Sequence, residues 1–153
     1  MAYIYLYAFA LVLCNAEVSM EKYKILVKGI VQYGDKYLVV KRWYDDRIAD
    51  PYQWEFLDGR VVFGESPDKA VIRNITEKTR IEAYISKIMY TWSFMVGDVC
   101  NIGITYLCIT TQDDVVLSED LLEYKWITKD EIPRYITNQN VLEDLNKSLT
   151  GEL

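Results

Sequence analysis

The stretch Gly59–Ile81, "GRVVFGESPDKAVIRNITEKTRI", decides how the rest of the sequence is interpreted. Its triplet Ser66-Pro67-Asp68 favours a helix start, because serine can cap, proline suits the first helical position and aspartate meets the positive end of the helix dipole. We expect a helix from Pro67 to about Thr79. Its buried stripe recurs near i, i+4 and i+8 and consists of Ala70, Val71, Ile75 and Thr79. The stretch therefore predicts a loop that leads into an amphipathic helix.

Extended segments are predicted on both sides of that helix. Tyr23–Gln32 and Tyr37–Tyr44 are rich in β-branched and aromatic residues and are joined by a Gly-Asp turn. A short strand is expected at Trp54–Leu57, after the polar loop Asp45–Gln53. The remaining expected elements are extended segments at Arg80–Val96, Cys100–Gln112 and Tyr124–Ile127, and a closing amphipathic helix at Asn138–Leu149. This order of elements predicts an α+β fold.

The composition excludes several classes of chemistry. The chain has 153 residues, a formal net charge of −6, three Cys and no His. Without His, Ser-His-Asp triads, Cys-His pairs and the usual zinc sites lack the parts that they need. The negative net charge argues against a protein whose main partner is a nucleic acid. The odd number of Cys residues, without CxxC spacing, favours a reducing cytoplasm over a disulfide framework.

Residues 1–19 form an apolar N-terminal extension with no charged residue before Glu17. Their apolar stretch, Ala2–Cys14, is shorter than the roughly 20 residues that a membrane-spanning helix needs, so we expect no stable membrane span. Three interpretations are open: translation starts at Met20, the segment is a cleaved secretory signal, or it adds an ordered strand or helix to the core. We expect the folded domain to occupy residues 20–153.

The spacing within the opening stretch resembles the Nudix box, G-x5-E-x7-R-E-U-x-E-E-x-G-U, in which U is a bulky aliphatic residue. The matching positions are Gly59, Glu65, Arg73, Ile75, Glu77 and Ile81. The flanks strengthen the match: "WEFLDGRVVFGES" is similar to W-E-F-P-G-G-K-x-E-x-G-E-S, and "EYKWITKDEI" is similar to the W-x-x-x-D-E-I/L segment near the end of that domain. The resemblance extends from Lys22 to about Lys147.

This resemblance implies a Nudix fold, which is a mixed β-sheet sandwiched between helices. It also implies hydrolysis of a nucleoside diphosphate linked to another moiety, with Mg²⁺ or Mn²⁺ as cofactor. Such an ion neutralises phosphate oxygens and lowers the pKa of a bound water. Carboxylates at i, i+3 and i+4 share a helix face and can hold it. The implied catalytic residues and metal ligands are Glu77 and Glu65, while Gly59 and Arg73 have structural roles. From the residues alone, Glu77 is equally compatible with a solvated helix acid paired with Arg73, and Glu65 with an acid that holds the loop by hydrogen bonds.

The box departs from the family pattern where the pattern has its cluster of three acids. Here these positions are Asn74, Glu77 and Lys78, so their summed charge is zero instead of −3. A unit charge at about 4 Å contributes roughly 4 kcal/mol at an effective dielectric near 20, so we expect a large loss of metal affinity. Arg80 replaces the glycine that usually ends the helix, which costs about 1–2 kcal/mol if the left-handed conformation is kept.

Candidates for ligand binding lie in and around the polar loop. The cations there can bind a diphosphate, or they can be edge-strand charges that block aggregation. They are Lys41, Arg42 and Arg47. Aromatic residues can stack on a nucleobase or belong to the core; they are Tyr44, which we place in the binding set, and Trp43, Tyr52 and Trp54. Acids that can complete a metal site are Asp45, Asp46, Asp50 and Glu123. Lys78 can bind a phosphate as a point charge, but we favour a solvent-facing lysine that suits the helix dipole.

Two classes of function are compatible with these residues. The first, which we favour, is a Nudix-type diphosphate hydrolase with a weakened metal site. The second is a catalytically inactive Nudix-fold module that binds a nucleotide or another protein, because a fold does not fix a function. In both cases we expect a small nucleotide-type ligand, a cytoplasmic location and a homodimer. Dependence on a divalent metal separates the two hypotheses.

Overall fold

The computed structural model describes residues 20–43 and 52–150. Seven strands form one sheet: β1 (Lys22–Tyr33), β2 (Lys36–Arg42), β3 (Trp54–Glu55), β4 (Leu57–Arg60), β5 (Tyr84–Val96), β6 (Val99–Ile109) and β7 (Leu121–Thr128). The described helices are α2 (Pro67–Thr79), the 3₁₀ turn η1 (Lys129–Glu131), α3 (Ile132–Tyr135) and α4 (Gln139–Thr150). None of the helices in the described part is long and apolar enough to cross a membrane.

The sheet is mixed. Its main path runs in the order β3-β2-β1-β6-β5, while β4 pairs with β1 and β7 pairs with β2. Strands β1 and β6 are parallel, from Lys22 opposite Val99 to Gln32 opposite Ile109. The other pairs are antiparallel. Parallel pairing of β1 and β6 places the chain's first described strand in the middle of the sheet.

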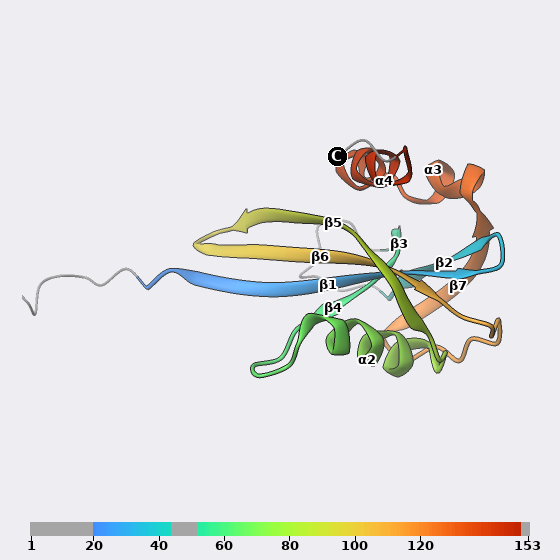
Figure 1. Cartoon of the computed structure of the whole chain (residues 1–153), viewed down its shortest axis with the longest axis horizontal. Coiled ribbons are helices and arrows are strands. Elements are labelled where there is room, and N and C mark those ends of the chain that lie inside the picture. Colours follow the sequence, from blue (N-terminus) through green and yellow to red (C-terminus); the bar gives the residue numbers. More distant parts are fainter. Residues whose placement is uncertain (1–19, 44–51, 151–153) are drawn as a thin grey trace, which may run out of the picture.

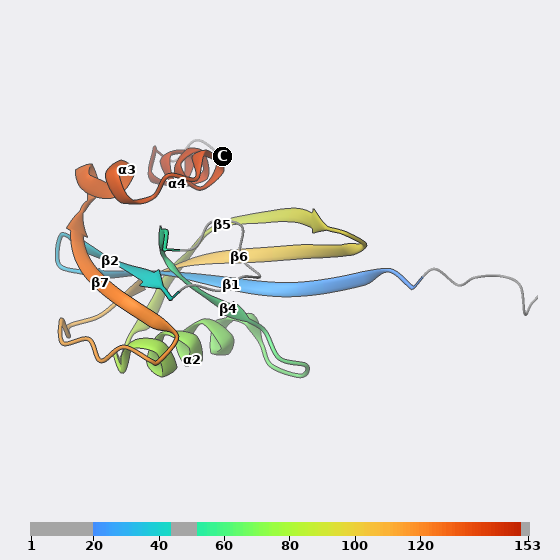
Figure 2. The ribbon, with the colours of Figure 1, turned by 180° about the vertical axis from the view of Figure 1, so that it is seen from behind.

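Helices cover both faces of this sheet. Figures 1 and 2 show α2 on one side, with α3 and α4 on the other. Alternation along β2 explains the two cores, because Leu38 and Val40 pack toward the α2 side whereas Val39 packs toward α3 and α4. The fold is therefore the α+β arrangement that the sequence predicted, a mixed sheet between helices.

The predicted α2 agrees with the structure at both ends. Ser66 takes the N-cap position in an extended conformation and Pro67 starts the helix, although the Ser66 hydroxyl makes no capping bond to the helix backbone. The predicted buried stripe, Ala70, Val71, Ile75 and Thr79, is buried. Arg80 ends the helix in the left-handed conformation, with φ 59°.

Three expectations about elements need correction. The segment Trp54–Leu57 is not one strand, because β3 pairs with β2 whereas β4 leaves it to pair with β1. The segment Arg80–Val96 is extended only from Tyr84, since Arg80 caps α2. The strand expected at Tyr124–Ile127 is longer, since β7 runs from Leu121 to Thr128 and leads into η1 and α3.

Candidate functional site

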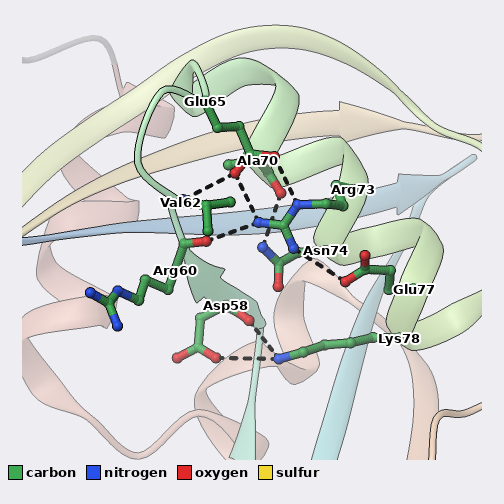
Figure 3. A network of polar contacts seen from close by, with 9 residues as sticks. All are labelled: Asp58, Arg60, Val62, Glu65, Ala70, Arg73, Asn74, Glu77 and Lys78. Atoms are coloured by element: carbon green, nitrogen blue, oxygen red, sulfur yellow. Dashed lines mark hydrogen bonds and ion pairs between the residues drawn. The ribbon is translucent and has the colours of Figure 1, made fainter.

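The loop before α2 is fastened to the helix through Arg73. Its guanidinium donates to both carboxylate oxygens of Glu65, at 2.7 Å from Nε and 2.9 Å from Nη2. Nη2 also donates to the Arg60 carbonyl at 3.0 Å, and the Val62 N–H donates to Glu65 Oε2 at 3.1 Å (Figure 3). The hydrogen bond from Arg73 lowers the pKa of Glu65 to about 2. Both ends of the loop are therefore held by one charged pair.

Glu77 lies one helical turn beyond Arg73 and contacts it from the other side. Arg73 Nη1 donates to Glu77 Oε2 at 3.2 Å, and the Glu77 side chain is 60% exposed. Glu77 lines a shallow depression of about 630 Å³ on the outer face of α2, beside Ile72, Thr76 and Ile85. The two predicted catalytic acids, Glu65 and Glu77, are thus both partners of the same arginine.

Asn74 occupies a buried position under the loop. Its amide nitrogen donates to the Ala70 carbonyl at 2.9 Å, and the residue is only 7% exposed. Gly59 lies so close that a Cβ there would be 1.8 Å from Asn74 Oδ1. The amide is therefore confined between the helix and β4.

Lys78 points inward, so the expectation that it faces solvent is wrong. Its side chain is 15% exposed, and its ammonium donates to the Asp58 carbonyl at 2.6 Å and lies 3.8 Å from Asp58 Oδ1 (Figure 3). Burial, followed by the charge of Arg42, lowers the pKa of Lys78, while the carboxylates of Asp58, Asp120 and Glu55 oppose this shift. The contacts of the Lys78 ammonium with Asp58 on β4 therefore outweigh the usual preference of a lysine in the last helical turn for solvent.

Arg42 joins the same group of charges from β2. Its guanidinium pairs with Glu55 on β3 and with Asp58 on β4. Burial acts to lower the pKa of Arg42, but Asp58 and Glu55 raise it overall. We call Arg42, Glu55, Asp58, Lys78 and Asp120 the Lys78 cluster.

Lys41 does not join Arg42, because neighbouring residues of a strand face opposite sides of the sheet. Its ammonium lies 3.0 Å from Glu123 Oε2 and 5.0 Å from the centre of the Trp54 ring. Trp54 in turn packs edge-on against Tyr135. The two described cations of the predicted binding set are therefore separated, and each already faces an acid.

The other predicted site residues are only partly described. Tyr44, Arg47 and the spare acids Asp45, Asp46 and Asp50 lie outside the described residues. Among the described aromatic residues, Trp43 and Tyr52 are about half exposed, at 52% and 48%. Roles for these residues in ligand binding stay predictions.

The described residues do not fit a divalent metal ion at the box. Mg²⁺ and Mn²⁺ prefer oxygen ligands, yet within residues 20–43 and 52–150 no group of three or more His, Cys, Asp or Glu side chains could hold a metal. The box itself contributes a buried amide at Asn74 and an ammonium at Lys78. Glu123 pairs with Lys41 on the other face.

Sequence reasoning did not identify the acids that surround Lys78. Glu55 and Asp58 lie within the flank of the box, where a strand pattern alone gives no reason to select them. Asp120 is remote in sequence and is positioned by backbone bonds, since Ser118 N donates to the Lys78 carbonyl at 2.9 Å and Val116 N donates to the Thr79 carbonyl at 3.0 Å. One signal was present in the sequence: Lys78 stands where the family pattern has an acid, and a cation at such a position is expected to have acids near it.

A family model confirms the resemblance that the box and its flanks indicate. The NUDIX domain model matches residues 24–145. This chain belongs to the Nudix family. It is 24% identical over 127 residues to the nucleoside triphosphatase NudI of Escherichia coli O17:K52:H18 (strain UMN026 / ExPEC), with 75% of this chain and 89% of that protein covered. NudI of Escherichia coli O81 (strain ED1a) is 26% identical over 126 residues, with the same coverage.

Solved Nudix structures share the fold. The MutT protein of Methanosarcina mazei Go1 superimposes with a TM-score of 0.73 at 21% identity, covering 86% of this chain and 96% of that one. A binary complex of the Caenorhabditis elegans Ap4A hydrolase gives a TM-score of 0.68 at 18% identity, covering 84% and 96%. These similarities establish the Nudix fold of the chain, while the site must be judged from its own residues.

Proposed function

We propose that this Nudix-family chain binds a small nucleotide-type ligand and does not hydrolyse it by divalent-metal chemistry. One observation carries the proposal: the box presents a confined amide at Asn74 and an inward ammonium at Lys78 where metal-binding acids are needed. The ligand class is supported by relatives that are named for nucleotide substrates. A cytoplasmic location and a homodimer belong to the same proposal.

The charges explain why metal chemistry is disfavoured. A divalent ion at the box would meet a cation at Lys78 and an uncharged side chain at Asn74. At about 4 Å, one positive charge repels a doubly charged cation by roughly 8 kcal/mol at an effective dielectric near 20, before desolvation is counted. The one box acid that is well exposed, Glu77, can at most cancel the charge of Lys78, which leaves no net attraction for the ion.

A phosphate group can still find cations without a metal. The predicted binding set is Lys41, Arg42, Arg47 and Tyr44. Of its described members, Lys41 is the easier to recruit, because its partner Glu123 is 50% exposed and pairs of this kind contribute only about 0.2–1 kcal/mol. We therefore expect ligand phosphates to displace Glu123 from Lys41.

Metal-dependent hydrolysis, which the sequence favoured, is the second candidate. The observation in its favour is the Glu77 carboxylate, which is 60% exposed and held by a single 3.2 Å bond to Arg73. Glu77 is free to turn toward an ion bound with the substrate, and Glu65 is the next acid along the loop. In that case Glu77 and Glu65 would be the residues that hold Mg²⁺ or Mn²⁺.

Ligand binding and turnover measured on the full chain separate the two candidates. The panel contains nucleoside triphosphates, nucleotide sugars, dinucleoside polyphosphates and ADP-ribose. Each compound is tested by calorimetry and by phosphate release, with Mg²⁺, with Mn²⁺ and with chelator. Glu77→Gln is compared with Glu82→Gln, which removes an exposed carboxylate just beyond α2.

We expect one or more nucleotides to bind equally well in chelator, with no turnover in any condition. Metal-dependent turnover that Glu77→Gln abolishes and Glu82→Gln leaves intact would establish the hydrolase instead. An absence of both binding and turnover across the panel would overturn the nucleotide proposal and favour an interaction module.

A further inference from the structure

The Lys78 cluster gathers its charges from five places in the chain. Arg42 comes from β2, Glu55 from β3, Asp58 from β4 and Lys78 from α2. Asp120 precedes β7 and is brought close by the bonds that join Val116 and Ser118 to the end of α2. Such convergence of distant segments on one ammonium points to a role in organising the site.

Lys78 is held by backbone as well as by charge. The 2.6 Å bond to the Asp58 carbonyl fixes the ammonium against β4, at the entrance of the box loop. Lys78 also accepts the Ser118 N–H through its own carbonyl at 2.9 Å. The residue therefore bridges the helix, the box loop and the segment before β7.

The acids of the cluster need a cation. Glu55 is partly buried, and burial together with the charge of Asp58 raises the pKa of Glu55, while Arg42 and Lys78 counteract that shift. Desolvation acts to raise the pKa of Asp120, which is an exposed residue, but the Ser118 hydroxyl and the charge of Lys78 outweigh it and lower the pKa. Two cations face three carboxylates, so removal of either cation leaves an uncompensated group of acids.

We propose that the Lys78 ammonium is a built-in cation that takes the place of a divalent metal ion at the box. It holds the acids of the Lys78 cluster together permanently, so folding and ligand binding need no Mg²⁺ or Mn²⁺ there. A carboxylate at position 78 would leave Arg42 alone against four acids and turn the cluster into a divalent-cation site. The inference rests on the metal-independent part of the proposed function and not on the identity of the ligand.

Direct metal titration tests this proposal without any nucleotide. Binding of Mn²⁺ is measured by the loss of the free-ion electron paramagnetic resonance signal, and Mg²⁺ by its effect on the melting temperature, for the full wild-type chain and for Lys78→Glu. The matched control is Lys69→Glu, which makes the same charge change at an exposed position of α2. Omission of nucleotide keeps the result separate from the test of the proposed function.

We expect the wild type and Lys69→Glu to show no specific Mn²⁺ site and no change in melting temperature with Mg²⁺. Lys78→Glu should bind Mn²⁺ more tightly than Lys69→Glu by about tenfold or more, since it replaces a repelling charge with an attracting one. It should also melt higher in Mg²⁺ than in chelator. A variant that folds only when a divalent ion is present would support the proposal equally.

Two results would overturn it. One is a specific Mn²⁺ site in the wild type that Asp58→Asn removes. The other is a folded Lys78→Glu whose affinity for Mn²⁺ equals that of Lys69→Glu. If Lys78→Glu does not fold under any condition, Lys78→Gln takes its place, and a folded Lys78→Gln without Mn²⁺ affinity above the wild type counts against the proposal.

Discussion

The side chain of Asn74 lies directly against the backbone of Gly59. A Cβ on Gly59 would be 1.8 Å from Asn74 Oδ1 and 2.0 Å from its Cγ, far inside any normal contact. The amide cannot retreat easily, since Nδ2 donates to the Ala70 carbonyl at 2.9 Å and the residue is buried. The box glycine and the residue that replaces the first of the three clustered box acids are therefore coupled by packing.

Gly59→Ala should destabilise the fold by about 1–3 kcal/mol, because the added methyl group overpacks the site against the buried Asn74 amide. Asn74→Ala should relieve that clash, so the double variant should lose less stability than the two single losses combined. Urea unfolding of the four proteins gives this double-mutant cycle. Strictly additive losses would mean that the two residues do not press on one another.

The local part of the site could be predicted from sequence, whereas the long-range part could not. Helix α2 was predicted because its capping residues and its buried stripe are properties of the segment itself. The inward direction of Lys78 was not predicted, because the argument from the helix dipole considers the helix alone. The residues that draw its ammonium inward lie elsewhere in the chain: Asp58 on β4 binds it, and the carboxylates of Glu55 and Asp120 attract it. The separation of β3 from β4 likewise depends on pairing with two different strands.

Glu65 should make the fold sensitive to acid. The hydrogen bond from Arg73 lowers the pKa of Glu65 from its usual 4.5 to about 2. A depressed folded-state pKa means that the unfolded chain takes up the proton first. The stabilisation is therefore fully present above about pH 4.5 and is lost as the pH falls through about 2.

Glu65→Gln should remove that dependence on pH. The variant should be less stable than the wild type at pH 7, and the difference should shrink as the pH falls toward 2. Glu143→Gln, at an exposed position of α4, is the control and should follow the wild type. Chemical denaturation across the acid range provides the comparison, and a gap between Glu65→Gln and wild type that stays constant with pH would contradict it.

Arg42 and Lys41 should differ in their effect on stability although they are neighbours. Arg42→Ala leaves Glu55 and Asp58 without their guanidinium, and we expect a loss of about 1–3 kcal/mol, below the 3–5 of a fully buried pair, since these groups are partly exposed. Lys41→Ala breaks an exposed pair with Glu123 and should cost about 1 kcal/mol or less.

The pH dependence of this pair of variants is a further check. Burial already raises the pKa of Glu55, and Arg42 counteracts it. Without Arg42 the folded state should hold the Glu55 proton to higher pH, so Arg42→Ala should lose more stability as the pH rises from 5 to 8. Urea unfolding at both pH values is sufficient, and equal losses for Arg42→Ala and Lys41→Ala throughout would refute the assignment.

Arg80 ends α2 in the left-handed conformation, at φ 59° and ψ 11°, with its N–H donated to the Thr76 carbonyl. A residue with a Cβ is strained there by about 1–2 kcal/mol, and the greater freedom of glycine in the unfolded chain returns about 0.4–1 kcal/mol of that. Arg80→Gly should therefore stabilise the protein by about 0.5–1 kcal/mol, which is roughly 1–4 °C in melting temperature for a chain of this size. Arg80→Ala is the control, because it removes the same exposed side chain and keeps the Cβ. If Arg80→Gly melts no higher than Arg80→Ala, the helix does not end in this conformation.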